Sequence, residues 1–313
     1  GDYRRLQNIS SANPIALLKV VAEKEGTNFL DAHYVAERLN PRYDITIIQP
    51  LLYDLVARGF INYNKDEEEI EVKEKVFHYA NASQKKEDYD YLKIISKSDS
   101  VNAVMSIAQK MIYANGINSV EFSPKQRVAL KPLKGQVTFK KNRDMDFDGR
   151  LFAGLSIFQG KDFRYNYIKH KIEMDSVRYF DLFIPTEAKD QQGNPVALSM
   201  ASRIEKLSGT LLIDAPHNKS GQEDIASFPS FNSKGASYVF YGNKDIQGGA
   251  YKRDSFYFQL NEFNFNDLDN FPKEAISFDG EMVSAEIFPV FKETLVLREE
   301  DQSLGFVSRT PTE

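Results

Sequence analysis

Residues 135–167, GQVTFKKNRDMDFDGRLFAGLSIFQGKDFRYNY, alternate apolar and polar positions in short segments separated by Asn, Asp and Gly. This alternation places the apolar side chains on one face of a β-strand. The positions expected to face inward are Val137, Phe139, Phe147, Leu151, Ile157, Phe163 and Tyr165. The pattern therefore predicts β-strands here, and similar segments continue toward the C-terminus.

The first 60 residues follow a helical period instead. Asn13-Pro14 is a good helix start, and apolar positions at helical spacing continue to Gly26. Asp31 and Asp44 are the expected caps of two further helices, which end at Leu39 and at Arg58-Gly59. Because a proline inside a helix costs about 3 kcal/mol, Pro50 suggests that the third helix begins near residue 49.

A hairpin is predicted after Gly59, from the segments FINYN, KDEE and EIEVKEKVFHY. Three helices followed by a hairpin resemble the winged-helix family in order and length. Winged helices most often bind DNA, but the third helix carries Asp44 and Asp54, and the hairpin turn is acidic from Asp66 to Glu69. These charges would repel phosphates, so we predict no nucleic-acid partner.

The predicted fold class is α+β, with a winged-helix-like domain over residues 1–83 and a β-rich domain over residues 84–313. Residues 91–122 also admit helices, and we favour strands. The phrase FDG recurs at 147–149 and at 278–280, which indicates a repeated rung-like unit. We predict a solenoid-like stack of short strands, with a β-sandwich as the alternative, and a helical cap on its open edge.

Composition excludes several classes of function. The 313 residues carry a net charge of −5 and include no cysteine, which rules out disulfides and thiol chemistry. No apolar run reaches the length of about 18 residues that a membrane-spanning helix needs. The chain begins with Gly1 and lacks an apolar leader. We expect a piece of a longer protein, so the missing leader does not bear on export.

Asp144, Asp146 and Asp148 alternate ahead of Gly149, as at the start of a calcium-binding loop. The acid expected to close the loop is replaced by Leu155, so these three residues are a candidate metal site on half a motif. The histidines at 33, 78, 170 and 217 lack zinc-ligand spacing. The sequence contains no phosphate loop, dinucleotide fingerprint or serine-hydrolase elbow, and we predict no cofactor.

Glycoside hydrolysis would need two carboxylates at a set separation. The acids considered for it are Asp146, Asp148, Glu173 and Asp175, although the chain has no Trp to stack on sugars. The segment from Asp214 to Gly221 is either a binding loop or, as we favour, a long turn.

The phrases FDGRLFAGLSIFQGKDFRYNY, LSGTLLIDAPHNKSG and FDGEMVSAEIFPVF resemble segments of large uncharacterised β-rich proteins of Bacteroides-type bacteria. The likeness covers roughly residues 100–313 and includes no active-site motif. It implies a cell-envelope or periplasmic setting. We therefore expect a non-enzymatic structural or interaction segment, whose partner is the rest of its own longer chain or another envelope protein. The alternative is a polysaccharide-binding or polysaccharide-cleaving β module.

Overall fold

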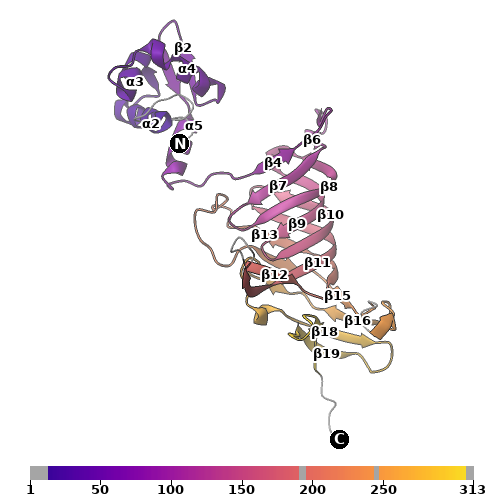
Figure 1. Cartoon of the computed structure of the whole chain (residues 1–313). Helices are drawn as coiled ribbons and strands as arrows, with labels where there is room; N and C mark the ends of the chain where they lie inside the picture. Colours follow the sequence, from indigo (N-terminus) through magenta and orange to yellow (C-terminus); the bar gives the residue numbers. More distant parts are fainter. Residues whose placement is uncertain (1–12, 190–194, 243–246, 308–313) are drawn as a thin grey trace. The chain divides into compact units, whose positions relative to one another are not determined.

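The computed structural model describes residues 13–189, 195–242 and 247–307 (Figure 1). The chain divides into two compact units, residues 1–89 and residues 90–313. The sequence placed this boundary at residue 83. Within the described residues, no helix is both long enough and apolar enough to cross a bilayer.

Four helices form most of the described part of the first unit, residues 13–89: α2 (Pro14–Glu25), α3 (Ala32–Leu39), α4 (Ile45–Ala57) and α5 (Glu74–Ser83). The expected caps are present. The side chain of Asn13 accepts hydrogen bonds from the amides of Ile15 and Ala16, and Asp31 and Asp44 cap α3 and α4 in the same way. Each cap satisfies amide groups that have no partner inside the helix.

Two local predictions in this unit are wrong. Helix α4 begins at Ile45 and not near residue 49, and Pro50 lies inside it. The apolar side of α4, which includes Leu51, Leu52 and Leu55, is buried in the core of the unit. This burial offsets the cost of the proline. In addition, the strand of the hairpin ends at Val72, and the following segment forms α5.

The strands of the first unit are β1 (Phe29–Asp31), β2 (Ile61–Asn64) and β3 (Glu69–Val72). They form an antiparallel sheet in the order β1-β3-β2. Ile61, Ile70 and Val72 are buried among the helices. The unit therefore has a hydrophobic core of its own.

The regular secondary structure of the second unit is almost entirely β-strand. Its strands are β4 (Lys93–Ser96), β5 (Ala103–Ser106), β6 (Met111–Ala114), β7 (Ile117–Ser123), β8 (Val128–Phe139), β9 (Met145–Ala153), β10 (Ser156–Asn166), β11 (Lys171–Lys189), β12 (Pro195–Ser199), β13 (Ile204–Leu212), β14 (Ser230–Ser233), β15 (Ser237–Phe240), β16 (Phe256–Leu260), β17 (Asn264–Phe265), β18 (Ser277–Ser284), β19 (Phe291–Leu297) and β20 (Leu304–Gly305). Three short 3₁₀ turns, η1 (Lys141–Arg143), η2 (Gln247–Gly249) and η3 (Lys273–Ala275), lie between them.

These strands pair antiparallel, mostly with a neighbour in the sequence. The main series runs β4-β7-β8-β9-β10-β11-β13-β15-β16-β18-β19-β20. Three short branches join this series. Strand β6 pairs with the C-terminal part of β8 and with β5. Strand β12 pairs with β11, and β14 pairs with both β13 and β17.

This topology confirms the α+β class with a large β-rich part but not the solenoid-like stack. A solenoid stacks successive repeats on one another. Here short connections fold most strands back beside the preceding one, which produces a meander of hairpins with a few longer crossings. The error arose because the recurring phrase FDG marks similar strand geometry at β9 and β18 rather than a stacked repeat.

The sheet is strongly curved, and aromatic rings fill its inner face. The ring centroids of Phe122 in β7 and Tyr165 in β10 are 4.7 Å apart, although β8 and β9 lie between these strands. Phe158 in β10 and Phe231 in β14 are 4.9 Å apart across β11 and β13. In a flat sheet, strands three positions apart would be separated by about 14 Å. Curvature therefore brings these rings together.

Most of the predicted inward positions are confirmed. Val137, Phe147, Leu151, Phe163 and Tyr165 are buried, and Phe139 packs against the same core while partly exposed. Ile157 is the exception, because it follows the β9–β10 turn and pairs in register with Phe152 and Asp181 on the outer face. Its neighbour Phe158 is buried instead.

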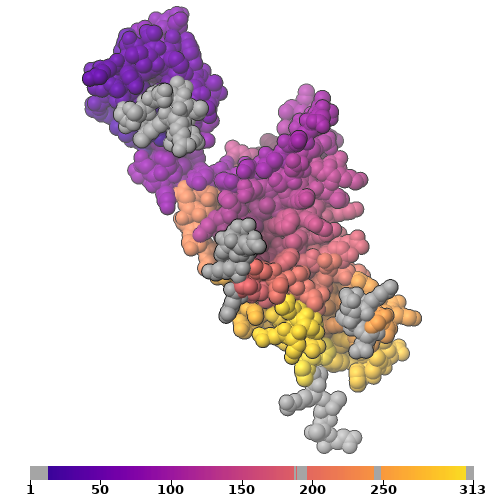
Figure 2. Space-filling model, in the orientation of Figure 1, coloured from indigo at the N-terminus to yellow at the C-terminus, as the bar shows by residue number. Residues whose placement is uncertain are grey.

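The hairpin formed by β5 and β6 projects from the β unit (Figures 1 and 2). Val104, Met105 and Ile107 are exposed on it, with 58%, 67% and 84% of their surface accessible. This hairpin therefore contributes little to the core of the β unit.

Candidate anion-binding groove

One row of cross-strand partners crosses the outer face of the curved sheet. In register, Lys131 of β8 pairs with Arg150 of β9, Arg150 with Gln159 of β10, Gln159 with Tyr179 of β11, and Tyr179 with Glu205 of β13. We call these five residues the outer row. They are exposed or half-buried, so the row presents polar and charged groups to solvent.

A second row beside it contains two glycines. Gly149 pairs with Pro132 and with Gly160, and Gly160 pairs in turn with Val177. A Cβ atom at Gly160 would lie 2.1 Å from the carbonyl oxygen of Ser176, a distance that no side chain tolerates. Strands β10 and β11 are therefore closer together at Gly160 than a residue with a side chain would allow.

The regular ladder breaks immediately after this row. Register shifts occur between Pro132 and Val137 in β8, between Gly160 and Phe163 in β10, and after Met174 in β11. Such β-bulges bend a strand and redirect side chains. The outer face is hollowed where these bends occur.

The hollow is a groove of about 1010 Å³, which we call the basic groove. Its lining includes six cationic side chains, which are Lys131, Lys134, Arg150, Lys161, Arg178 and Lys206. Among the described residues, Asp175 is the one acid in the lining, and its carboxylate lies 2.6 Å from Nη2 of Arg164. Two further hollows of about 580 and 720 Å³ adjoin the groove, and both share Lys134 with it.

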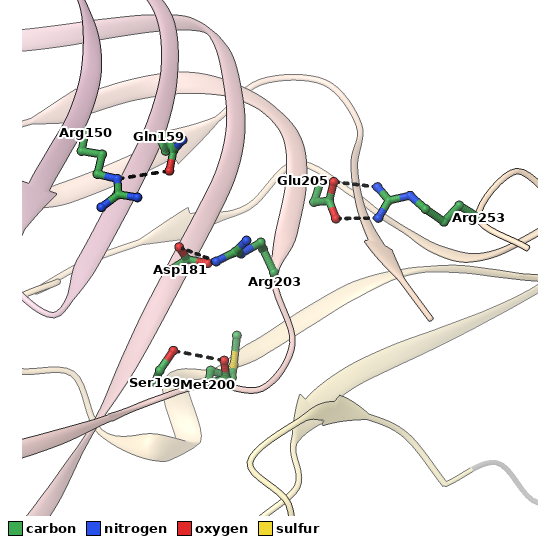
Figure 3. A network of polar contacts seen from close by, with 8 residues as sticks. All are labelled: Arg150, Gln159, Asp181, Ser199, Met200, Arg203, Glu205 and Arg253. Carbon is green, nitrogen blue, oxygen red and sulfur yellow. Dashed lines mark hydrogen bonds and ion pairs between the residues drawn. The ribbon is translucent and has the colours of Figure 1, made fainter. Parts of the chain in front are cut away.

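Within the described residues, none of the six cations forms an ion pair. Arg150 Nε donates a hydrogen bond to Gln159 Oε1 at 3.3 Å (Figure 3). The guanidinium of Arg178 lies 4.8 Å from the ring centre of Tyr179, and Lys206 Nζ lies 5.6 Å from that of Tyr238. The groove therefore concentrates uncompensated positive charge, which attracts anions, on a chain whose net charge is negative.

Two ion pairs neutralise the acids at one end of the groove (Figure 3). Asp181 accepts hydrogen bonds from Arg203 at 2.5 and 3.2 Å, and Glu205 accepts two from Arg253 at 3.0 and 2.6 Å. Hydrogen bonding to Glu205 raises the pKa of Arg253. Such two-point contacts are the stronger class of ion pair. The nearby carboxylates therefore do not cancel the field of the groove cations.

The three predicted metal ligands, Asp144, Asp146 and Asp148, each have a partner within the protein. Asp146 and Asp148 line the hollow of about 580 Å³ that adjoins the basic groove. Asp144 Oδ1 accepts the Tyr167 amide at 2.8 Å, and Asp148 Oδ1 accepts the Asp162 amide at 2.9 Å. Asp146 forms an ion pair with Lys140. Among the described residues, no three acids or histidines gather as a metal site would require. The calcium site stays a prediction that this geometry does not support.

The acids considered for glycoside hydrolysis are likewise paired with cations. Glu173 accepts a hydrogen bond from Lys171 at 2.7 Å, which lowers the pKa of its carboxyl. A general acid needs a raised pKa, so Glu173 is unsuited to that role. Glu173 and Asp175 meet at Arg164, with N–O distances of 3.7 and 2.6 Å.

The segment from Asp214 to Gly221 is a turn that a buried network holds in place. Asp214 accepts hydrogen bonds from Gln126 Nε2 at 2.8 Å and from Asn218 Nδ2 at 3.1 Å. Asn218 also accepts the Glu223 amide at 2.9 Å. Gln126, Asp214 and Asn218 are all buried, which fits the structural interpretation of this segment.

The histidines are not gathered into one site. His33, His78 and His217 contact Glu68, Glu87 and Glu223, respectively. The buried His170 lies 3.1 Å from the hydroxyl of Tyr165 through its Nδ1 atom. Each ring therefore has its own local partner.

Sequence reasoning missed the basic groove. A usable signal was present in the phrases Gly149-Arg150 and Gly160-Lys161, in which a cation follows a glycine inside a predicted strand. Glycine within a strand often marks a bulge or a close approach. Only the register shows that these phrases lie side by side.

Comparisons with protein-family models, curated proteins and solved structures gave no match for this chain.

Proposed function

We propose that the chain is a non-enzymatic interaction segment of a larger bacterial cell-envelope protein, and that its β unit binds an anionic ligand in the basic groove. The observation that carries this proposal is the set of six groove cations without ion pairs among the described residues. Unpaired, accessible cations around a hollow are the arrangement that an anionic partner would complete.

The acids also favour binding over catalysis. Asp146, Glu173 and Asp175 are each engaged by Lys or Arg. Asp148 accepts a backbone amide. These contacts already use the carboxylate oxygens that a catalytic acid or base would offer to a substrate. The envelope setting is part of the proposal and follows from the sequence resemblance.

For the first unit, the order α2-β1-α3-α4-β2-β3 supports a winged-helix-like fold. Its hairpin turn carries Asp66, Glu67 and Glu68, and these three side chains are exposed. We assign this unit to protein docking, with the rest of the longer chain or another envelope protein as the partner. The acidic turn argues against nucleic acid.

The experiment measures binding of the whole chain to fluorescent dextran sulfate, with neutral dextran as the reference. The groove variant combines Lys131→Glu, Lys161→Glu and Arg178→Glu. The control variant combines Lys93→Glu, Lys110→Glu and Lys273→Glu, which changes the net charge equally at exposed sites outside the groove. We expect binding only to the sulfated polymer, weakened about tenfold or more in the groove variant alone.

Equal weakening in both variants would show that net charge, and not the groove, determines binding. Absence of binding to dextran sulfate at low salt would overturn the proposed function. Circular dichroism of both variants checks that the fold is retained.

A further inference from the structure

We propose that the natural ligand of the basic groove is an acidic polysaccharide, whose carboxylated sugars lie across strands β8 to β13. The inference rests on the proposed anion-binding function and names the ligand of the same site. It starts from the positions of the cations. Lys131 lies on β8, Arg150 on β9, Lys161 on β10, Arg178 on β11 and Lys206 on β13.

These five strands are consecutive neighbours in the sheet. Each therefore contributes at least one cation to the groove. Neighbouring strands lie about 4.8 Å apart, so five of them extend over about 19 Å. A single small anion would engage one or two of these cations. The spread over five strands fits an extended polymer with repeated negative charges.

Neutral hydrogen-bonding groups stand between the cations. Gln159, Ser176 and Ser208 line the same groove. Gln159 accepts from Arg150 through Oε1, which leaves its amide NH₂ group directed to other acceptors. A polymer that carries hydroxyls as well as carboxylates would use both kinds of group. A sugar acid has this combination.

The aromatic groups beside the groove argue against single-stranded nucleic acid. Proteins that bind single strands stack bases on accessible aromatic rings. Here Arg178 and Arg203 lie 4.8 and 4.4 Å from the ring centre of Tyr179. Lys206 and Arg253 lie 5.5 and 4.0 Å from that of Phe240. The cations already occupy these rings, and none of the described residues that line the groove is aromatic.

The strand pairing argues against an acidic peptide that would add a strand to the sheet. This mode of binding needs an unpaired sheet edge. Strands β9, β10 and β11 are hydrogen-bonded on both sides. The ligand must therefore be recognised by side chains on the outer face.

The test compares probes of matched charge against the whole chain. Calorimetry or fluorescence anisotropy measures the affinity of the chain for four kinds of probe. They are oligogalacturonates of increasing length, the same oligomers with methyl-esterified carboxylates, single-stranded DNA and polyglutamate. We expect affinity for oligogalacturonate to rise with length until the oligomer spans the five strands, and to disappear on esterification. We expect the DNA and polyglutamate to bind at least about tenfold more weakly.

The variant Gln159→Leu separates sugar recognition from charge, because it leaves all six cations in place. It should weaken oligogalacturonate binding about threefold to tenfold and leave dextran sulfate binding unchanged. Equal affinity for all polyanions, or tighter binding of DNA, would overturn the ligand class while the anion-binding function stands. Loss of every polyanion, dextran sulfate included, would overturn both.

Discussion

The two faces of the curved sheet are built from alternate residues of the same strands, yet they have different chemistry. In β10, Phe158 and Phe163 face the aromatic core and have no accessible surface. Gln159 and Lys161, from the same strand, line the basic groove on the other side. In the proposed function, one strand thus contributes to stability through one face and to ligand binding through the other. Substitutions on the two faces should affect different measurements.

The largest effect on stability is expected from Phe158→Ala. The Phe158 ring stacks on Phe180 with centroids 4.5 Å apart and also contacts Phe231. Removing a buried phenylalanine costs about 3–5 kcal/mol, which urea denaturation would measure. The control Phe152→Ala, on the outer face of β9, should cost less than half as much. Equal costs would show that the two faces do not differ in this way.

The next largest loss of stability is expected from a substitution at Gly160, where β10 bends. The change Gly160→Ala forces a Cβ atom toward the Ser176 carbonyl, which should cost about 1–3 kcal/mol. Because the bulges shape the groove, dextran sulfate binding should weaken as well. Gly235→Asn is the control, since Gly235 has open space around it and a φ of +68° that Asn tolerates. Unchanged stability and binding in Gly160→Ala would contradict the described bend.

The buried hydroxyl of Tyr165 gives the inner face a dependence on alkaline pH. Burial raises the pKa of Tyr165 above its usual value of 10.0, so the folded protein keeps the neutral phenol. The unfolded chain loses that proton near its usual pKa. The contribution of Tyr165 to the free energy of unfolding is therefore independent of pH below about pH 10, and it decreases above that pH.

The variant Tyr165→Phe tests this dependence. It should lose about 1 kcal/mol at neutral pH, because the contact with His170 is removed. Its stability should then fall less steeply above pH 10 than that of the unmodified protein. Urea denaturation at a series of pH values measures both effects, and parallel curves would contradict the assignment.

The smallest effect on stability is expected from Arg150→Gln on the outer row. Arg150 is exposed and has one hydrogen bond to Gln159, so the free energy of unfolding should change by less than about 0.5 kcal/mol. Dextran sulfate binding should nevertheless weaken several-fold. A substantial loss of stability without a change in binding would reverse the roles assigned to the two faces.

Local sequence signals predicted the parts of the fold that depend on near neighbours. Asn13, Asp31 and Asp44 were correctly identified as helix caps because capping involves residues two or three positions away. Alternation located β9 and β10 for the same reason. It misassigned Ile157, because the turn before β10 changes which residues of the strand face inward.

The remaining features depend on contacts that are distant in the sequence. The groove exists because Lys131, Arg150, Lys161 and Lys206 meet through the register of separate strands, and bulges alter that register. Pro50 stays inside α4 because tertiary burial offsets its local cost. The segment after Val72 forms a helix whose Val76 and Ala80 are buried in the first unit. None of these effects is visible in a window of a few residues.

The meander topology also has a consequence for how the β unit acquires its structure. Most of its strand pairs join consecutive strands, so each new hairpin of this kind can add to those already formed with little loss of chain entropy. Growth of the sheet can then proceed stepwise from any nucleated pair. We infer that damage to one outer hairpin would fray that region first, before the ring-filled centre loses its order.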